Sequence, residues 1–280
     1  MNTPFKKLAL AITFSPNALA LLMEAKRLKD EFSAELTLIH AGKKTPETEK
    51  RLNGLLESTG ISQEQVKIVI VNGDPADVII MACKEEKTDL LIAGALEKET
   101  LLKYYLGSVA RRIMRQATFS VLILTSPKEK PRHLKKFCVE VDFSPESEVT
   151  ARKAYEFALL EKAESFILIR EFQAPGIAIT VQDTGSTRDT EKIIDNWLQE
   201  EEAKMTVFLN ELKLKGIPVQ TVCLFGRKGW EASQYVNETH ADILVVSAPK
   251  KKLGIMDRLF QHDMEFILKD LPSTFLIVRS

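Results

Sequence analysis

The chain has 280 residues, of which 45% are hydrophobic, and its 39 lysines and arginines balance its 39 aspartates and glutamates. This length suits two domains of ordinary size with a sizeable core in each, and the balanced charge gives no argument for binding nucleic acid or an anionic membrane. Three widely spaced cysteines argue against a disulfide framework and favour a cytoplasmic protein, and no apolar stretch reaches the roughly 18 residues that span a membrane.

The first half of the chain alternates short apolar runs with segments of helical periodicity. Continuous Leu, Ile and Val runs are typical of strands whose two sheet faces are both covered, and their alternation with helices indicates an open, doubly wound parallel sheet. We expect Ser15 to cap the first helix and Pro16 to lie in its first turn, and we expect the same of Ser144 and Pro145 in the second half. The predicted strands cover 6–13, 35–40, 66–71, 89–94 and 119–124, and the predicted helices cover 16–32, 45–59, 75–87 and 106–116.

The second half repeats the first. The Phe-Ser-Pro sequence at 14–16 returns at 143–145, and the Asp-Leu-Leu-Ile run from Asp89 returns as Asp-Ile-Leu-Val from Asp242. A period near half the chain length indicates two copies of one domain. The predicted elements of this half cover 136–142, 145–160, 165–170, 187–214, 218–224, 229–238, 242–247, 260–269 and 274–278.

We expect one domain over residues 1–126, called half one, and a second over 135–280, called half two, joined by a polar linker that contains proline. The two copies lie 129 residues apart at their first strands but 153 apart at their fourth strands. Half two therefore carries 24 additional residues, near 171–194, after its second strand. Such a long added connection is either a functional lid or contact loop, or a tolerated surface excursion.

Ligands of open α/β sheets bind beyond the carboxyl ends of the strands, near the point where the strand order reverses. Glycines at such ends let backbone N–H groups approach phosphates closely, and a helix N-terminus favours anions. The alternative is that the glycines only allow the loop to turn and to cap a helix. In half one the candidate cofactor-binding residues at these ends are Thr13, Val71, Gly73, Gly94, Gly107, Ser108 and Val109.

The sequence after the fourth strand of half one suggests a family. Gly94, Ala95, Leu96 and Glu97 are followed by nine residues and then by the Gly-Ser pair at 107–108. This pattern is similar to the Gly-x-x-Gly, nine residues, Gly-Ser/Thr motif of the nucleotide-binding members of the universal stress protein family. Together with the Phe-Ser-Pro sequence and the Gly-Ser-Val-Ala-Arg-Arg-Ile run, the resemblance covers essentially the whole chain as a tandem pair.

The resemblance implies two tandem doubly wound parallel five-stranded sheets, each of strand order 3-2-1-4-5, in a fold of the adenine-nucleotide alpha-hydrolase type. It implies that the fifth strands, 121–124 and 274–278, pair within the chain, which would cover apolar strands otherwise left at an open edge. Two chains could pair further as a homodimer. In the family, an acidic residue that ends the first strand contacts the nucleoside, and the loop after the third strand lies beside the sugar.

The chain departs from the family motif in both copies. Half one has Thr13 in place of the acidic residue. It also has Glu97 in place of the second glycine, where a carboxylate adds bulk and would repel a phosphate. Half two keeps the acidic residue, Asp142. Its loop has lost all three glycines and the Ser/Thr, and the corresponding residues are Ser247, Lys250, Phe260 and Gln261.

Three functions remain open. The first is a stress-response binding or regulatory protein that works with protein partners rather than as a turnover enzyme. The second is a switch that binds ATP or AMP with Mg²⁺ through half one, with slow hydrolysis. The third is a pocket for another small anionic or apolar ligand, formed by the insertion, whose residues 177–179 are apolar. No catalytic residue is predicted, and no pair of the four histidines has metal-ligand spacing.

Overall fold

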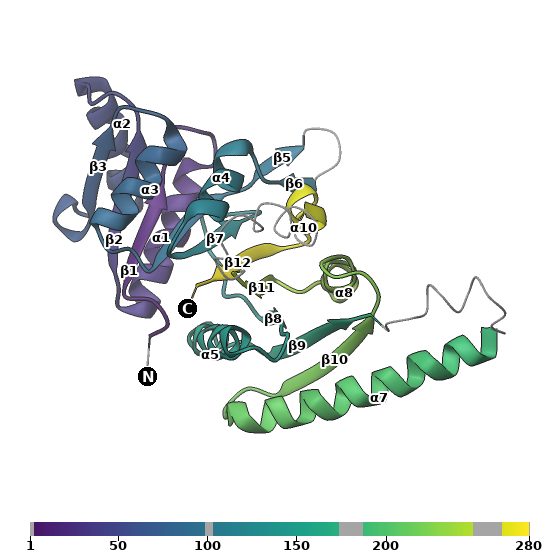
Figure 1. Cartoon of the computed structure of the whole chain (residues 1–280). Helices are drawn as coiled ribbons and strands as arrows, with labels where there is room; N and C mark the ends of the chain where they lie inside the picture. The colour runs from purple at the N-terminus through teal and green to yellow at the C-terminus, as the bar shows by residue number, and fades with distance from the viewer. Residues whose placement is uncertain (1–2, 99–102, 174–186, 249–264, 280) are drawn as a thin grey trace.

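The computed structural model describes residues 3–98, 103–173, 187–248 and 265–279. These residues form one ten-stranded sheet with helices on both faces (Figure 1). The strand order is β10-β9-β8-β11-β12-β7-β4-β1-β2-β3, and the strands within each half are parallel. Each half is therefore a doubly wound sheet of order 3-2-1-4-5, which confirms the predicted fold class.

Every element predicted in half one is present, with limits within two residues of the expected ones. Two features were not predicted: a single 3₁₀ turn before the third strand, and a small hairpin, β5–β6, after the fourth. The elements are β1 (Lys7–Ala11), α1 (Ala18–Phe32), β2 (Glu35–Ala41), α2 (Pro46–Thr59), η1 (Gln63–Gln65), β3 (Lys67–Val71), α3 (Pro75–Glu85), β4 (Leu90–Gly94), β5 (Leu96–Lys98), β6 (Lys103–Tyr105), α4 (Ser108–Gln116) and β7 (Ser120–Leu124).

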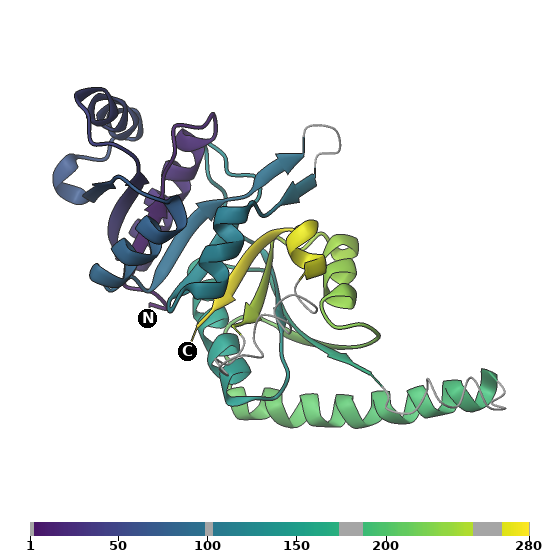
Figure 2. The same ribbon diagram turned by 45° about the horizontal axis from the view of Figure 1, so that its top comes forward.

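Half two follows the same plan, with one much longer helix. Its elements are β8 (Lys136–Glu140), α5 (Pro145–Leu160), β9 (Ser165–Phe172), α7 (Thr187–Leu212), β10 (Val219–Phe225), α8 (Trp230–Thr239), β11 (Ile243–Ser247), α10 (Glu265–Lys269) and β12 (Thr274–Val278). The predicted insertion near 171–194 lies largely outside the described residues, at 174–186. Figures 1 and 2 show that the first part of α7 projects beyond the end of the sheet. Among the described helices, none is long and apolar enough to cross a membrane.

Two hydrophobic layers cover the sheet and continue through both halves. Helices α1, α2, α5 and α7 pack on one face, where Leu22 and Phe157 are fully buried. Helices α3, α4, α8 and α10 pack on the other, around residues such as Met114 and Val236. The halves are joined where β12 runs antiparallel to β7, with Leu276 opposite Leu122. This is the pairing of fifth strands that the sequence led us to expect.

The two copies begin their first helices differently. In half two, Ser144 caps α5 at Pro145 as predicted, and its hydroxyl accepts a hydrogen bond from the Ser147 N–H at 3.2 Å. In half one, the predicted cap at Ser15 and start at Pro16 are wrong, because α1 begins at Ala18 after an Asn17 that makes no side-chain cap bond.

A difference one residue upstream of Phe-Ser-Pro explains the two starts. The Asp142 carboxylate accepts hydrogen bonds from both the N–H and the hydroxyl of Ser144, and so fixes the turn that precedes the helix. Thr13 stands at the matching position of half one and has no carboxylate with which to do so.

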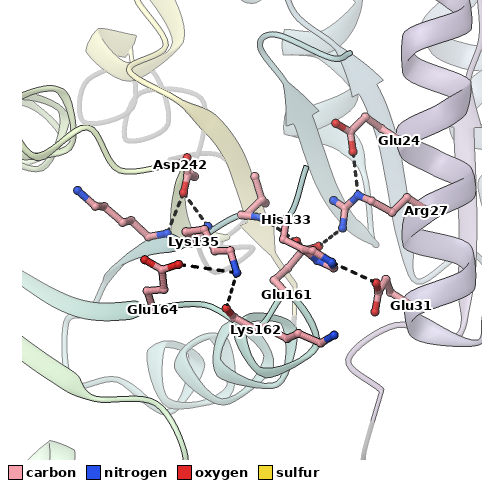
Figure 3. Close-up of polar contacts among 11 residues, drawn as sticks. Glu24, Arg27, Glu31, His133, Lys135, Glu161, Lys162, Glu164 and Asp242 are labelled. Carbon is pink, nitrogen blue, oxygen red and sulfur yellow. Dashed lines mark hydrogen bonds and ion pairs between the residues drawn. The ribbon is translucent and has the colours of Figure 1, made fainter. Parts of the chain in front are cut away.

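A buried ionic network ties α1 of half one to the end of α5 in half two (Figure 3). The Glu161 carboxylate is completely buried and receives the Arg27 guanidinium at 2.6 Å. Its second oxygen accepts the Leu134 N–H at 2.7 Å and lies 3.3 Å from His133 Nδ1. Arg27 also contacts Glu24 at 3.2 Å. The network therefore joins both halves and the segment that links them.

Replacing Arg27 by methionine tests this network. The change leaves the buried Glu161 carboxylate without its cation, and we expect the free energy of unfolding to fall by about 3 kcal/mol. The matched control is Lys29→Met in the same helix, whose partner Asp30 has a side chain 58% exposed. The control should lose less than about 1 kcal/mol. Urea denaturation of the three proteins measures both changes, and equal losses would contradict a special role for the Arg27–Glu161 pair.

Candidate functional site

The predicted site residues of half one lie at the carboxyl edge of its sheet. Val71 and Gly94 are the last residues of β3 and β4, Thr13 follows β1, and Gly73 follows β3. Gly107 is the N-cap residue of α4. The loop after β3 is held to α4 by Arg112, whose guanidinium forms ion pairs with Asp74 at 2.9 Å and with Asp77. The fold thus brings the loop after β3 to the first turns of α4. It places Thr13 at the same edge, two strands away from β3.

Neither Gly94 nor Gly107 has a positive φ, so neither is needed for a left-handed turn. Both lie against leucine side chains instead. A Cβ built on Gly94 would lie 2.9 Å from Cδ1 of the buried Leu21, and one built on Gly107 would lie 2.8 Å from Cδ1 of Leu96. Close packing against the buried Leu21 therefore accounts for the glycine at 94, whereas a Cβ at 107 would meet only the end of the half-exposed Leu96 side chain.

The segment between these glycines folds as the antiparallel hairpin β5–β6, in which Leu96 pairs with Tyr105 and Glu97 with Tyr104. The Leu96 side chain reaches Gly107, so an apolar group lies beside the N-terminus of α4, where a phosphate would be held. Successive strand residues point to opposite faces, so Glu97 is directed away from Gly107. The obstacle to a phosphate is therefore Leu96 rather than the Glu97 carboxylate that the sequence singled out.

The hairpin is anchored to half two. Tyr104 forms a β-bridge with Leu271, whose N–H donates to the Tyr104 carbonyl at 2.9 Å. The Leu106 N–H donates to the carbonyl of Leu268 at 3.2 Å, and the Arg111 guanidinium reaches the same carbonyl at 3.1 Å. The conformation of this loop is therefore set by the partner half, which reasoning on the local sequence could not reveal.

The N-terminus of α4 keeps some capacity to bind an anion. Gly107 has no side chain with which to cap it, and Ser108 and Val109 are exposed. Arg112, the cation one turn further on, is engaged by Asp74 and Asp77. An anion at this end would therefore meet backbone N–H groups but no free arginine from these positions.

In half two the matching edge is only partly described. Lys250, Phe260 and Gln261 lie outside the described residues, and Ser247 donates its hydroxyl to Thr150 at 2.9 Å. The Asp142 side chain reaches the surface. Desolvation of its carboxylate raises the pKa, but hydrogen bonds from Ser144 and the charge of Lys228 outweigh this effect, and the pKa is lowered. Within the described ranges, no group of three or more His, Cys, Asp or Glu residues could hold a metal ion.

Glu171 is the titratable group of this edge that sequence reasoning missed. It is 5% exposed and accepts the Gly229 N–H at 2.8 Å and the Ala232 N–H at 2.7 Å, so it caps the start of α8. Burial, together with the negative charge of Glu140, raises the pKa of Glu171 to about 7. The sequence signal for it was an acidic residue near the end of a strand whose central residues, 166–169, are apolar.

The fold and site define a class: paired doubly wound α/β domains with a glycine-bearing loop at the carboxyl edge of the first. Residues 4–125 match the model of the universal stress protein family. Universal stress protein YxiE of Bacillus subtilis is 25% identical over 146 residues, covering 43% of this chain and 99% of that protein. Universal stress protein MJ0531 of Methanocaldococcus jannaschii is 30% identical over 81 residues, covering 29% of this chain and 46% of that protein.

The fold likeness extends over both halves. A crystal structure of a proposed universal stress protein from Pseudomonas aeruginosa UCBPP-PA14 has a TM-score of 0.71 at 17% identity, covering 98% of this chain and 93% of that one. The first half of the chain therefore matches the universal stress protein family in sequence, and the likeness of fold extends to the second half.

The packing of Gly94 can be tested by its stability effect. Gly94→Ala forces Leu21 to move within a buried layer, and we expect the free energy of unfolding to fall by about 1–2 kcal/mol. Gly54→Ala is the matched control, because it lies inside helix α2 with nothing within 4 Å of an added Cβ. It should raise stability by roughly 0.5–1 kcal/mol. If Gly94→Ala proved neutral in urea denaturation, the packing explanation would fail.

The raised pKa of Glu171 predicts that the stability of the protein depends on pH. The folded pKa of about 7 lies above the ordinary glutamate pKa of 4.5, so between these values the folded state retains a proton that the unfolded state releases. Stability should therefore fall as pH rises through this window. Relative to Glu171→Gln, the wild type should lose on the order of 2 kcal/mol between pH 4.5 and pH 7. Urea denaturation across this range measures the difference. The exposed Glu164→Gln is the control, and a pH-independent difference for Glu171→Gln would refute the assignment.

Proposed function

We propose that this protein is a tandem universal stress protein that acts as a binding or regulatory protein in the stress response, not as a turnover enzyme. The sequence match to the family supports a role in the stress response. We propose that half one retains a degenerate nucleotide site, and that the protein works without nucleotide. The domain limits 1–126 and 135–280, a cytoplasmic location, protein partners and a homodimer belong to the same proposal.

The observation that carries the proposal is the hairpin between Gly94 and Gly107. Its Leu96 side chain lies against the N-terminus of α4, and its strand β6 is bonded to half two through Tyr104. A phosphate there would have to displace an apolar group, and a nucleoside would meet Thr13 where a carboxylate is expected. The described residues therefore fit a nucleotide poorly, and we derive no nucleotide chemistry from them.

A second candidate function is the ATP- or AMP-binding switch with Mg²⁺. It is favoured by the uncapped N-terminus of α4 and by the exposure of Leu96, which is 50% and would let a ligand push the side chain aside. The third candidate, a ligand pocket formed by the insertion, depends on residues outside the described ranges and gains no support here.

Calorimetric titration with ATP and Mg²⁺ separates the first two candidates. We expect the wild type and Glu97→Gly to show no binding at about 1 mM ligand, because Leu96 remains in place in both. The double variant Leu96→Gly/Glu97→Gly removes the covering side chain and should bind. Adding Gly107→Trp to that double variant should abolish its binding.

Two results would contradict the proposal. Binding by the wild type that Gly107→Trp alone abolishes would establish the nucleotide switch. If the double variant is folded by circular dichroism but does not bind ATP, half one keeps no nucleotide site at all.

A further inference from the structure

A cavity of about 280 Å³ lies at the junction of the two halves, away from the Gly94–Gly107 loop. Thr118 and Asp89 line it just before β7 and β4, and Ser120 is the first residue of β7, so it lies at the amino edge of the half-one sheet. Half two contributes Lys153 from α5 and Arg279 from just beyond β12. The cavity therefore combines residues from both halves.

Three cations line this cavity with only one carboxylate. Lys6, Lys153 and Arg279 form no ion pair with any acidic side chain in the described part of the chain. The carboxylate is that of Asp89, and one of its oxygens already accepts the N–H groups of Lys6 and Lys7 at 2.8 and 2.9 Å. The lining thus carries an excess of two positive charges.

Several polar groups of the cavity already form hydrogen bonds within the protein. The Lys153 ammonium donates to the Arg279 carbonyl at 3.0 Å and lies 5.7 Å from the centre of the Phe5 ring. The Arg279 guanidinium donates through Nη2 to the Met114 carbonyl at 2.9 Å. Its Nε is buried and has no hydrogen-bond partner among the residues that the structure describes. The buried Ser120 hydroxyl accepts the Arg279 N–H at 3.0 Å.

Burial makes this arrangement costly while the site is empty. Burial lowers the pKa of Arg279, because the charged guanidinium loses solvation and finds no compensating anion. An anion in the cavity would supply the missing counter-charge.

The residues that match Lys153 and Arg279 on the pseudo-symmetric side of the junction are not cationic. The 129-residue spacing of the first helices matches Lys153 with Glu24, and the register of β7 and β12 matches Arg279 with Thr125. Glu24 belongs to the closed ionic network of Arg27 and Glu161. The cationic lining is thus particular to one side of a pseudo-symmetric junction, and does not follow from the repeated fold.

We propose that this cavity binds a small dianionic oxyanion of the phosphate class, either free phosphate or the phosphate of a small phosphomonoester. The ligand's two charges match the local excess. Its oxygens would accept hydrogen bonds from the ammonium groups of Lys6 and Lys153 and from the guanidinium of Arg279, the three cations of the lining. The cavity is independent of the loop between Gly94 and Gly107.

Isothermal titration with inorganic phosphate, at constant ionic strength in chloride, tests the proposal. Arg279→Gln keeps hydrogen-bonding capacity and removes the charge, and Lys153→Met keeps the packing on Phe5. Each should weaken binding about tenfold or more. Asp89→Asn removes the opposing charge and should tighten binding. Phosphate should also raise the thermal midpoint of the wild type and not that of Arg279→Gln.

Two matched controls should bind phosphate as the wild type does. Lys135→Met changes the half-two counterpart of Lys6, and Gly107→Trp blocks the N-terminus of α4. Glycerol phosphate distinguishes the sources: binding as tight as that of inorganic phosphate assigns a phosphomonoester, and a preference for inorganic phosphate assigns the free ion. The proposal is overturned if the wild type shows no binding up to about 10 mM. It is also overturned if Lys153→Met, shown to be folded by its thermal midpoint, binds as tightly as the wild type, or if Gly107→Trp abolishes binding.

Discussion

The antiparallel pairing of β7 with β12 is the constraint on which the rest of the structure depends. Three residue pairs, Phe275–Ile123, Leu276–Leu122 and Ile277–Val121, lie opposite one another in the centre of the ten-stranded sheet, and all six side chains are buried. Exposed apolar edge strands of this kind would invite association with other chains, so pairing them internally removes two such edges. It also fixes where every residue of one half lies relative to the other.

Contacts across this junction also position side chains of both halves. The fixed relation brings Arg27 to the buried Glu161, brings Tyr104 to Leu271, and encloses the cavity beside Arg279. The loop after β4 is therefore not free to adopt whatever conformation a ligand would favour. The segment between Gly94 and Gly107 is instead part of the interface between the halves.

The sequence predicted the fold well because the fold depends on local patterns. Continuous apolar runs such as 120–124 and 274–278 marked the buried strands, and Ser144 with Pro145 marked the start of α5. The strand order followed from the family resemblance. Prediction failed where a contact between distant residues decides the outcome. Hairpin β5–β6 depends on Leu268 and Leu271 of the other half, and nothing in residues 95–106 shows this.

The candidate site was predicted only in part for related reasons. The glycines at 94 and 107 were found at the expected edge, but their neighbours Leu21 and Leu96 come from packing that no motif encodes. The late start of α1 follows from the missing carboxylate at Thr13. Because Phe-Ser-Pro is repeated in both halves, the sequence predicted the same helix start in each. Burial shifts the pKa values of Glu171 and Arg279. The sequence pattern predicted burial for the strands, but not for these charged residues at their ends.

Hydrogen exchange at the backbone amides of Leu106 and Leu271 tests most directly whether the loop after β4 is held on half two. These N–H groups donate to the carbonyls of Leu268 and Tyr104, so we predict that both exchange slowly and that ATP with Mg²⁺ leaves their rates unchanged. Exchange at the rate of a solvent-exposed amide, or a change in rate when the nucleotide is added, would contradict a nucleotide-independent protein with a closed site.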